Sequence, residues 1–286
     1  MSFLDHIRAC NAHDLSGFRR FELNGQPVGW VRHAMAEAMA DALPGFLTTP
    51  DRLTLAPDIT GFDARSDRLA DAAHWLAETG VITPLRGEFY PVGTGWGVPP
   101  LARLDRAATA VFGTESYGLH VNGVVRGADG APRLWVATRA RDRIIAPGKL
   151  DNMVAGGQPI GLTLADNLRK EAQEEAGLPA ALVDRAVSVG ALGYCLETPE
   201  GLKRDRLFLY DLELPPDVTP VNTDGEVESF ALWSLEAVAA SVRDSQDWKF
   251  NVPLVIIDFL IRHGHLTPDD EPEYLALIDG LRPPQR

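Results

Sequence analysis

Residues 155–178 read AGGQPIGLTLADNLRKEAQEEAGL, a turn of small residues followed by a helical pattern that carries three glutamates. Glu171, Glu174 and Glu175 follow the spacing i, i+3 and i+4, so a helix holds their side chains within about one turn of each other. The neighbouring face of that helix is apolar, with Leu164, Leu168, Ala172 and Ala176. A chain with this segment has to pack the apolar face against a second layer while the acidic edge stays open.

The three neighbouring carboxylates repel one another unless a positive charge lies among them. Hard oxygen ligands of this kind suit Mg²⁺, which keeps several waters and bridges to substrate phosphates. The pattern is therefore consistent with a divalent cation site. A solvated acidic helix face is the alternative, and the glutamate spacing alone is more typical of that second interpretation.

The chain as a whole is acidic, because 27 basic and 40 acidic residues give a net charge of −13. Such a surface repels phosphate backbones and anionic lipid headgroups, so we expect neither nucleic acid nor a membrane as a partner. No run of the sequence approaches the roughly 18 consecutive apolar residues that a membrane span requires. The N-terminal stretch lacks the apolar core of a signal peptide, which predicts a cytoplasmic protein.

The length of 286 residues indicates about two domains. We predict an α+β fold with a smaller mixed α/β domain over residues 1–115 and a second domain over 116–286 that ends in a helical extension. In the first domain Asn24-Gly25 is a hairpin signal, and apolar spacing predicts a helix over 67–79. The second domain is expected to contain strands near 117–125, 132–140, 186–196 and 206–214 and helices over 164–176 and 251–264.

The glutamate segment resembles the signature of the Nudix hydrolase family, in which a glycine, five residues, a glutamate and seven residues precede Arg-Glu-aliphatic-x-Glu-Glu-x-Gly-aliphatic. Gly156 takes the place of the opening glycine, and residues 171–178, EAQEEAGL, match the closing half. The resemblance implies an αβα sandwich with a mixed sheet. It also implies a loop, helix and loop that hold Mg²⁺ or Mn²⁺ against a small-molecule diphosphate.

Two positions depart from this signature. Leu162 stands where the family has its first glutamate, and Lys170 stands where it has arginine. In the family this pair is expected to brace the loop against the helix; apolar packing replaces a buried ion pair at little cost, whereas a lone buried charge is costly. We therefore predict that Leu162 packs inward and that Lys170 turns toward Asp166 or Glu174, four residues before and after it.

A narrower resemblance covers most of the chain. It rests on three segments, QPVGWV, PGKLDNMVAGG and FNVPLVIIDFLIRHG. They are similar to segments of a Nudix subgroup that has its own N-terminal domain. This subgroup includes the Nudix portion fused to thiamine pyrophosphokinase in some fungi. This resemblance implies hydrolysis of thiamine diphosphate, or of a damaged analogue such as oxo-thiamine diphosphate, to the monophosphate and phosphate. A hydrolase of another nucleoside or isoprenoid diphosphate and a catalytically silent ligand sensor are the alternatives. The sequence does not decide the oligomeric state, for which a homodimer is one option.

The resemblance also assigns the metal site. Glu171 and Glu175 are the expected ligands, with Glu174 and a backbone carbonyl of the turn at Gly156 completing the shell. Glu226, in the loop DGEVE, is the candidate for an additional ligand or for the general base that activates water. An ordinary loop acid is the alternative for that residue, and Glu228 is its substitute.

Candidate substrate-binding residues lie just before the helix. They are Arg139, Lys149, Asp151, Asn152 and Gly157, whose ordinary roles would be an exposed strand end and turn formation. Four aromatic side chains are weaker candidates for stacking on a substrate ring, since core packing is the usual role of such residues: Trp96, Trp135, Trp248 and Phe250.

Overall fold

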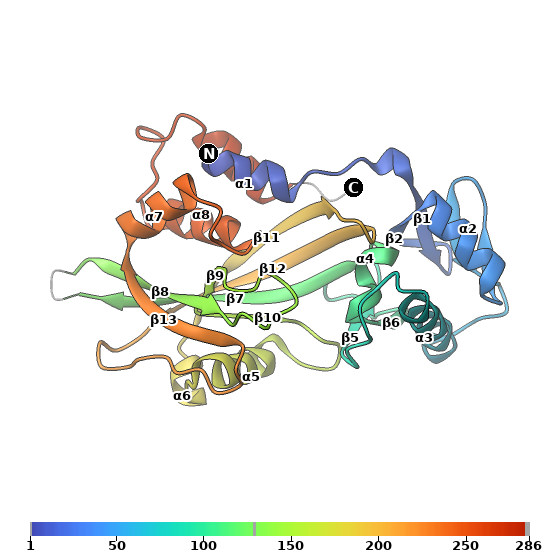
Figure 1. The fold of residues 1–286 in the computed structure, drawn as a ribbon, viewed down its shortest axis with the longest axis horizontal. Helices are drawn as coiled ribbons and strands as arrows, with labels where there is room; N and C mark the ends of the chain where they lie inside the picture. Colours follow the sequence, from blue (N-terminus) through green and yellow to red (C-terminus); the bar gives the residue numbers. More distant parts are fainter. Residues whose placement is uncertain (1, 128–129, 284–286) are drawn as a thin grey trace.

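The computed structural model describes residues 2–127 and 130–283 and arranges them as two units, each built around its own sheet (Figure 1). The smaller unit, drawn in blue and teal, lies beside one end of the larger sheet. None of the helices in the described residues is long and apolar enough to cross a membrane.

The smaller unit consists of β1 (Phe18–Leu23), β2 (Gln26–Arg32), α2 (His33–Ala42), β3 (Phe46–Thr48), β4 (Arg52–Leu55), α3 (Phe62–Glu78), β5 (Phe89–Val92), β6 (Ala102–Asp105) and α4 (Thr109–Phe112). Its sheet has the order β2-β1-β4-β3, and β5 and β6 form a separate antiparallel pair. One buried core, which includes Phe21, Leu69 and Phe112, joins these elements.

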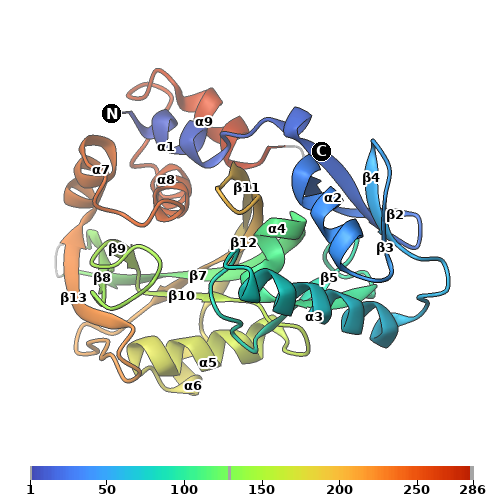
Figure 2. The ribbon, with the colours of Figure 1, turned by 45° about the vertical axis from the view of Figure 1, so that its right-hand side comes forward.

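The larger unit consists of α1 (Phe3–Cys10), β7 (Glu115–Arg126), β8 (Pro132–Arg139), β9 (Leu150–Asn152), β10 (Val154–Gly157), α5 (Leu164–Ala176), α6 (Ala180–Val183), β11 (Val187–Glu197), β12 (Leu202–Glu213), β13 (Val227–Ser234), α7 (Leu235–Asp244), α8 (Val252–Arg262) and α9 (Tyr274–Leu281). The sheet order is β11-β12-β7-β8-β13, and it is mixed because β12 runs parallel to β7. α5 and α6 cover one face, and α1, α7, α8 and α9 cover the other (Figure 2). The predicted αβα sandwich is confirmed.

The signature turn lies inside the larger sheet. β7 and β8 pair with each other over residues 123–126 of β7 and then part. In the space between them β10 pairs with β7 and β9 pairs with β8. Residues 155–157 are therefore hydrogen-bonded to a long central strand, which fixes the backbone of the turn under α5.

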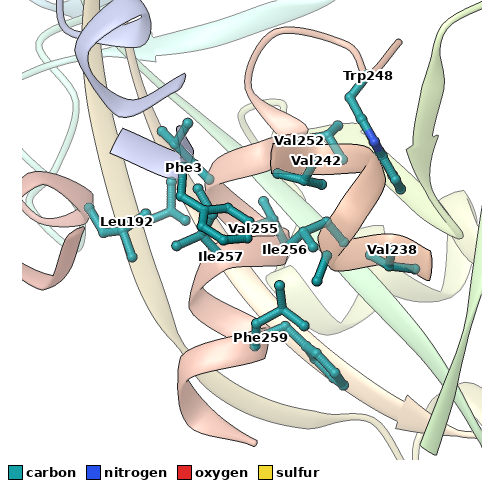
Figure 3. Packing of buried hydrophobic residues seen from close by; sticks show 14 of the residues in the cluster. Phe3, Leu192, Val238, Val242, Trp248, Val252, Val255, Ile256, Ile257 and Phe259 are labelled. Atoms are coloured by element: carbon teal, nitrogen blue, oxygen red, sulfur yellow. The ribbon is translucent and has the colours of Figure 1, made fainter. Parts of the chain in front are cut away.

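The face of the sheet opposite α5 carries a large apolar core around α8 (Figure 3). Val255, Ile257 and Phe259 of α8 are fully buried there. α1 belongs to the same core, since Phe3 is part of it and His6 Nε2 lies 2.6 Å from the carbonyl oxygen of Val242. α1 therefore packs in the larger unit, although it falls within the domain predicted over residues 1–115. For the segment that follows α1, the domain boundary near residue 115 stays a prediction.

Several local predictions are confirmed. β1 and β2 form a hairpin whose turn residues, Asn24 and Gly25, have φ values of 53° and 69°. α5 spans residues 164–176, as its apolar spacing predicts. α3 begins at Phe62 and not near residue 67. The apolar spacing does not reveal the first turn of this helix, because most of its residues lie at the surface.

Candidate active site

The position of α5 is set at both ends. At its start the side chain of Thr163 accepts a hydrogen bond from the backbone N–H of Asp166. At its end Gly177 has a φ of 63°, a conformation that favours glycine. Between the ends, Leu168 and Ala172 are buried against the sheet, so the acidic edge of the helix runs along β10.

Glu171 and Glu175 lie against the signature turn. Glu175 Oε2 accepts a hydrogen bond of 2.8 Å from the N–H of Ala155. A Cβ placed on Gly156 would lie 2.3 Å from Glu171 Cδ, so the turn has no room for a side chain there. The structure therefore brings together three of the residues expected at the metal site.

Both carboxyl groups have perturbed acidity. Burial raises the pKa of Glu175 well above its usual value, and the carboxylates of Asp151 and Glu171 raise it further, while the N–H of Ala155 acts in the opposite direction. Burial also raises the pKa of Glu171, against the effect of Lys170. A hard divalent cation between two such oxygen donors would stabilise their charged forms, so this donor set fits one.

Glu174 lies on the outer side of the helix. Lys170 Nζ is 2.8 Å from Glu174 Oε2 and 3.1 Å from Glu171 Oε1, which confirms the predicted turn of Lys170 toward Glu174. Within residues 2–127 and 130–283, no three acidic, histidine or cysteine side chains are grouped as a metal site. The ammonium of Lys170 bridges two of the three signature glutamates, Glu171 and Glu174, and so offsets part of the negative charge along the acidic edge of the helix.

The prediction that Leu162 packs inward is wrong, because 39% of this residue is exposed. Its backbone carbonyl accepts a hydrogen bond of 2.8 Å from Gln158 Nε2. Asn167 Nδ2 donates to the carbonyl of Gly157 at 2.7 Å and to Gln158 Oε1 at 3.1 Å. Two neutral amides thus brace the loop against the helix, and neither a charged pair nor a buried leucine is required.

Sequence reasoning missed both bracing residues. Gln158 is 1% exposed and Asn167 is fully buried, although amide side chains are usually found at the surface. The available signal was their position, since Gln158 stands four residues before Leu162 and Asn167 three residues before Lys170, the two places where the family signature is altered. The amide N–H groups of both residues have acceptors, so they tie the loop to the helix without burying charge.

Asp151 lies in a buried charged cluster next to the turn. Its Oδ2 is 2.9 Å from Arg139 Nη1 and 3.2 Å from Lys249 Nζ. Burial opposes ionisation, but Lys249, His120 and Arg139 together hold the pKa of Asp151 below its usual value. Arg139 and Asp151, both predicted to bind substrate, are thus engaged with each other, and Lys249 is a partner that the sequence analysis did not single out.

Asn152 links β9 to β7 through side chains. Its Nδ2 donates to Asn122 Oδ1 at 2.9 Å, and its Oδ1 lies 2.8 Å from His120 Nδ1. In this network the amide oxygen is the acceptor, so His120 carries its proton on Nδ1. Burial, together with the charge of Lys249, lowers the pKa of His120 to about 4.

The other predicted residues have partners away from Glu171 and Glu175. They are Lys149, which donates to the carbonyl of Gln246 at 2.9 Å, Glu226, which pairs with Arg143 at 2.7 Å, and Glu228, which pairs with Arg141 at 3.3 Å. The loop ahead of Glu226 does reach α5, because Thr223 Oγ1 donates to the carbonyl of Glu174 at 2.7 Å.

The smaller unit contacts the signature loop through β5. The carbonyl of Phe89 accepts a hydrogen bond of 2.9 Å from the N–H of Ile160. Tyr90 is buried, and a Cβ on Gly157 would lie 1.7 Å from its hydroxyl oxygen. Gly157 is therefore covered by a side chain from the other unit.

An αβα sandwich whose glutamate-bearing helix packs on a small-residue turn defines a Nudix-type hydrolase. The chain is 39% identical to "Nudix hydrolase 20, chloroplastic" of Arabidopsis thaliana, over 98% of this chain and 77% of that protein. It is 38% identical to "Nudix hydrolase 24, chloroplastic" of the same plant, again over 98% of this chain and 77% of that protein. The chain belongs to the Nudix hydrolase family.

Two further similarities concern parts of the chain. Residues 2–116 match a family model described as "Domain of unknown function (DUF4743)". A MutT protein from Methanosarcina mazei is similar in structure over 52% of this chain and 96% of that chain, with 17% sequence identity and a TM-score of 0.39. Nudix hydrolases generally use a divalent metal, and Glu171, Glu175 and the turn at Gly156 are the residues of this chain suited to hold it.

Proposed function

We propose that the protein hydrolyses thiamine diphosphate, or a damaged analogue of it, to the monophosphate and phosphate. One observation carries the proposal: the half-buried Glu171 and the buried Glu175 lie against a turn that has no room for a side chain at Gly156. A bare backbone next to two carboxylates allows a diphosphate to come close to both. The thiamine group is supported by the subgroup resemblance, which includes segments of the smaller unit.

Glu171, Glu175 and the backbone carbonyl of Gly156 would hold Mg²⁺ or Mn²⁺, with Glu174 at the outer edge. When bound, the ion supplies positive charge to the diphosphate and lowers the pKa of a bound water. The chain's own contribution is to hold the two carboxylates in place, through the N–H of Ala155 and the packing of α5.

The reaction consumes one water. A water oxygen forms a bond to one phosphorus, the bridging P–O bond breaks, and the proton of the water has to be accepted. We assign the role of proton acceptor to Glu226, with Glu228 as its substitute. The loop that precedes Glu226 reaches the glutamate helix, because Thr223 donates a hydrogen bond to the carbonyl of Glu174. Substrate-binding roles are proposed for Arg139, Lys149, Asp151, Asn152 and Gly157.

A hydrolase of another nucleoside or isoprenoid diphosphate and a silent ligand sensor are the competing proposals. We favour an enzyme because the chain keeps the three closing glutamates of the signature. The proposed partner is a small molecule, without nucleic acid or membrane. A cytoplasmic location and a homodimer are further proposals, to be measured by microscopy of the tagged protein and by sedimentation.

Phosphate release from a panel of diphosphates, with Mg²⁺ and with a chelator, tests the proposal. The panel contains thiamine diphosphate, oxo-thiamine diphosphate, ADP and isopentenyl diphosphate. We expect metal-dependent release with the highest kcat/KM for a thiamine compound. A higher kcat/KM for ADP or isopentenyl diphosphate would assign a different substrate, and no release from any compound would point to a sensor. Glu200→Gln, an exposed change away from the site, is the control variant.

A further inference from the structure

A hollow of about 300 Å³ lies where the two units meet, which we call the inter-unit hollow. Three chain segments line it: residues 91–100 from the end of β5 to just before β6, the start of β7 at Glu115 and Tyr117, and the signature loop over 158–162. Its volume is at the lower end of the range for small-molecule sites, which also form preferentially between domains. One wall of this hollow is thus the loop that leads into the glutamate helix.

Large apolar side chains are exposed in this hollow. Trp96 is 48% exposed, Val98 is 52% exposed and Leu162 is 39% exposed, and all three line it. Exposed apolar surface that converges on one concave site is typical of ligand binding. The other aromatic candidates are less accessible; Trp248, for example, is 4% exposed.

Trp96 also lies in an aromatic cluster. Its ring centroid is 4.9 Å from that of Tyr117 and 4.6 Å from that of Phe208. It stands in the segment GTGWG, where Gly95 and Gly97 both have positive φ. A tryptophan side chain has only two rotatable torsions, so it offers a rigid ring face at little conformational cost.

The charge of the hollow is low. Among the described residues that line it, Glu115 is the one charged side chain, and it accepts from the Tyr117 hydroxyl and pairs with Arg206 at 3.0 Å. Leu162 occupies the position where the family signature has a glutamate, so this wall is apolar. The departure from the signature therefore has a physical effect here: it removes a charge from the lining.

The hollow is adjacent to the glutamate pair along the chain. Gln158 lines it, and Gly156, two residues earlier, is in contact with Glu171. Two residues of extended chain span about 7 Å. A compound whose diphosphate meets Glu171 and Glu175 has its attached group within reach of the hollow.

We propose that the inter-unit hollow binds the flat heteroaromatic group of the diphosphate substrate, stacked on Trp96, with Leu162 and Val98 as apolar walls. This inference rests on the proposed diphosphate hydrolysis and adds the site of head-group recognition. It gives the smaller unit a direct part in substrate choice. Because ring stacking is equal in the ground state and the transition state, Trp96 contributes to binding and not to the chemical step.

The test compares Trp96→Ala, Trp96→Phe and the control Leu47→Ala in the full chain. Leu47 is 47% exposed, lies in the same unit and does not line the hollow. With thiamine diphosphate we expect Trp96→Ala to raise KM roughly tenfold with kcat within about twofold, as loss of one stacked ring implies. With isopentenyl diphosphate, which has no ring, KM should not change. Trp96→Phe should recover most of the affinity.

A second measurement separates this inference from the proposed function. Calorimetry with thiamine, which has no phosphate, should show binding to the wild type and to Leu47→Ala, and a loss of about tenfold or more in Trp96→Ala. Binding without any turnover would overturn the proposed function and keep the hollow. Three results would overturn the hollow as a head-group site. They are equal binding of thiamine by all variants, equal KM changes for both diphosphates, and a homodimer that dissociates in Trp96→Ala.

Discussion

The hydroxyl of Tyr90, from the smaller unit, lies so close to Gly157 of the signature loop that a Cβ on the glycine would be 1.7 Å from it. This contact stands beside the backbone hydrogen bond from Ile160 to Phe89. The loop that leads into α5 is therefore held partly by the other unit. A change in the contact is expected to affect the catalytic loop as well as the stability of the interface.

We predict that Gly157→Ala destabilises the protein by about 1–3 kcal/mol, because a new methyl group is forced into packed surroundings. Urea unfolding measures the change. Gly17→Ala is the matched control, since a Cβ at Gly17 meets nothing within 4 Å. Adding Tyr90→Phe should recover part of the loss by removing the hydroxyl; a Gly157→Ala variant as stable as the control would contradict the contact.

We predict that Glu171→Gln and Glu175→Gln lose turnover without losing stability. Each amide keeps the shape of the side chain but removes the ligand charge, so activity should fall by more than the roughly 10–100-fold typical of losing an outer partner of a metal site. Because burial raises the pKa of both carboxyls, a neutral amide is not expected to lower the melting temperature. Near wild-type rates in both variants would discard the metal assignment.

The bracing of the signature loop gives a contrast between two substitutions. Leu162 is 39% exposed, so Leu162→Ala should cost less than about 1 kcal/mol. Asn167 is fully buried and bonds to Gly157 and Gln158, so Asn167→Ala should cost about 1–3 kcal/mol by leaving those groups unpaired. Chemical denaturation of the two variants side by side checks the order; the reverse order would mean that the leucine side chain braces the loop.

The acidity of His120 predicts how stability depends on pH. Its pKa is about 4 in the folded chain against 6.5 for the free side chain, because burial disfavours the charged ring. The unfolded chain therefore binds a proton first as pH falls, and stability present above pH 6.5 is lost progressively down to about pH 4, by roughly 3 kcal/mol in total. His120→Asn should flatten this part of the profile, measured by urea unfolding at several pH values. His74→Asn, a substitution at an exposed histidine, is the control variant for this measurement.

The sequence predicted the parts of the site that depend on local spacing. α5, its cap at Thr163 and its apolar face follow from residues three and four positions apart, and the helix has the predicted bounds in the structure. The turn at Gly156 follows from a run of small residues at the position of the opening glycine of the family signature. These features are encoded within about 25 residues, so one sequence is enough to find them.

Two features of the site do not follow from the spacing of its residues. Leu162 is exposed where the ion-pair position of the family signature predicts a buried side chain, and Gln158 and Asn167 brace the loop in its place. The contact of Tyr90 with Gly157 joins residues 67 positions apart in different units. No periodicity reports such a contact, because periodicity reveals which face is buried and not what covers it.

The packing of α1 has a consequence for the order in which the chain can fold during synthesis. Cys10 Sγ lies 3.1 Å from the carbonyl of Phe250, and His6 Nε2 lies 2.6 Å from that of Val242, so the partners of the first helix are made more than 230 residues later. The core of the smaller unit, from Phe21 to Phe112, can close long before. α1 therefore cannot complete its packing until the C-terminal helices have been synthesised, and its apolar face stays uncovered until then.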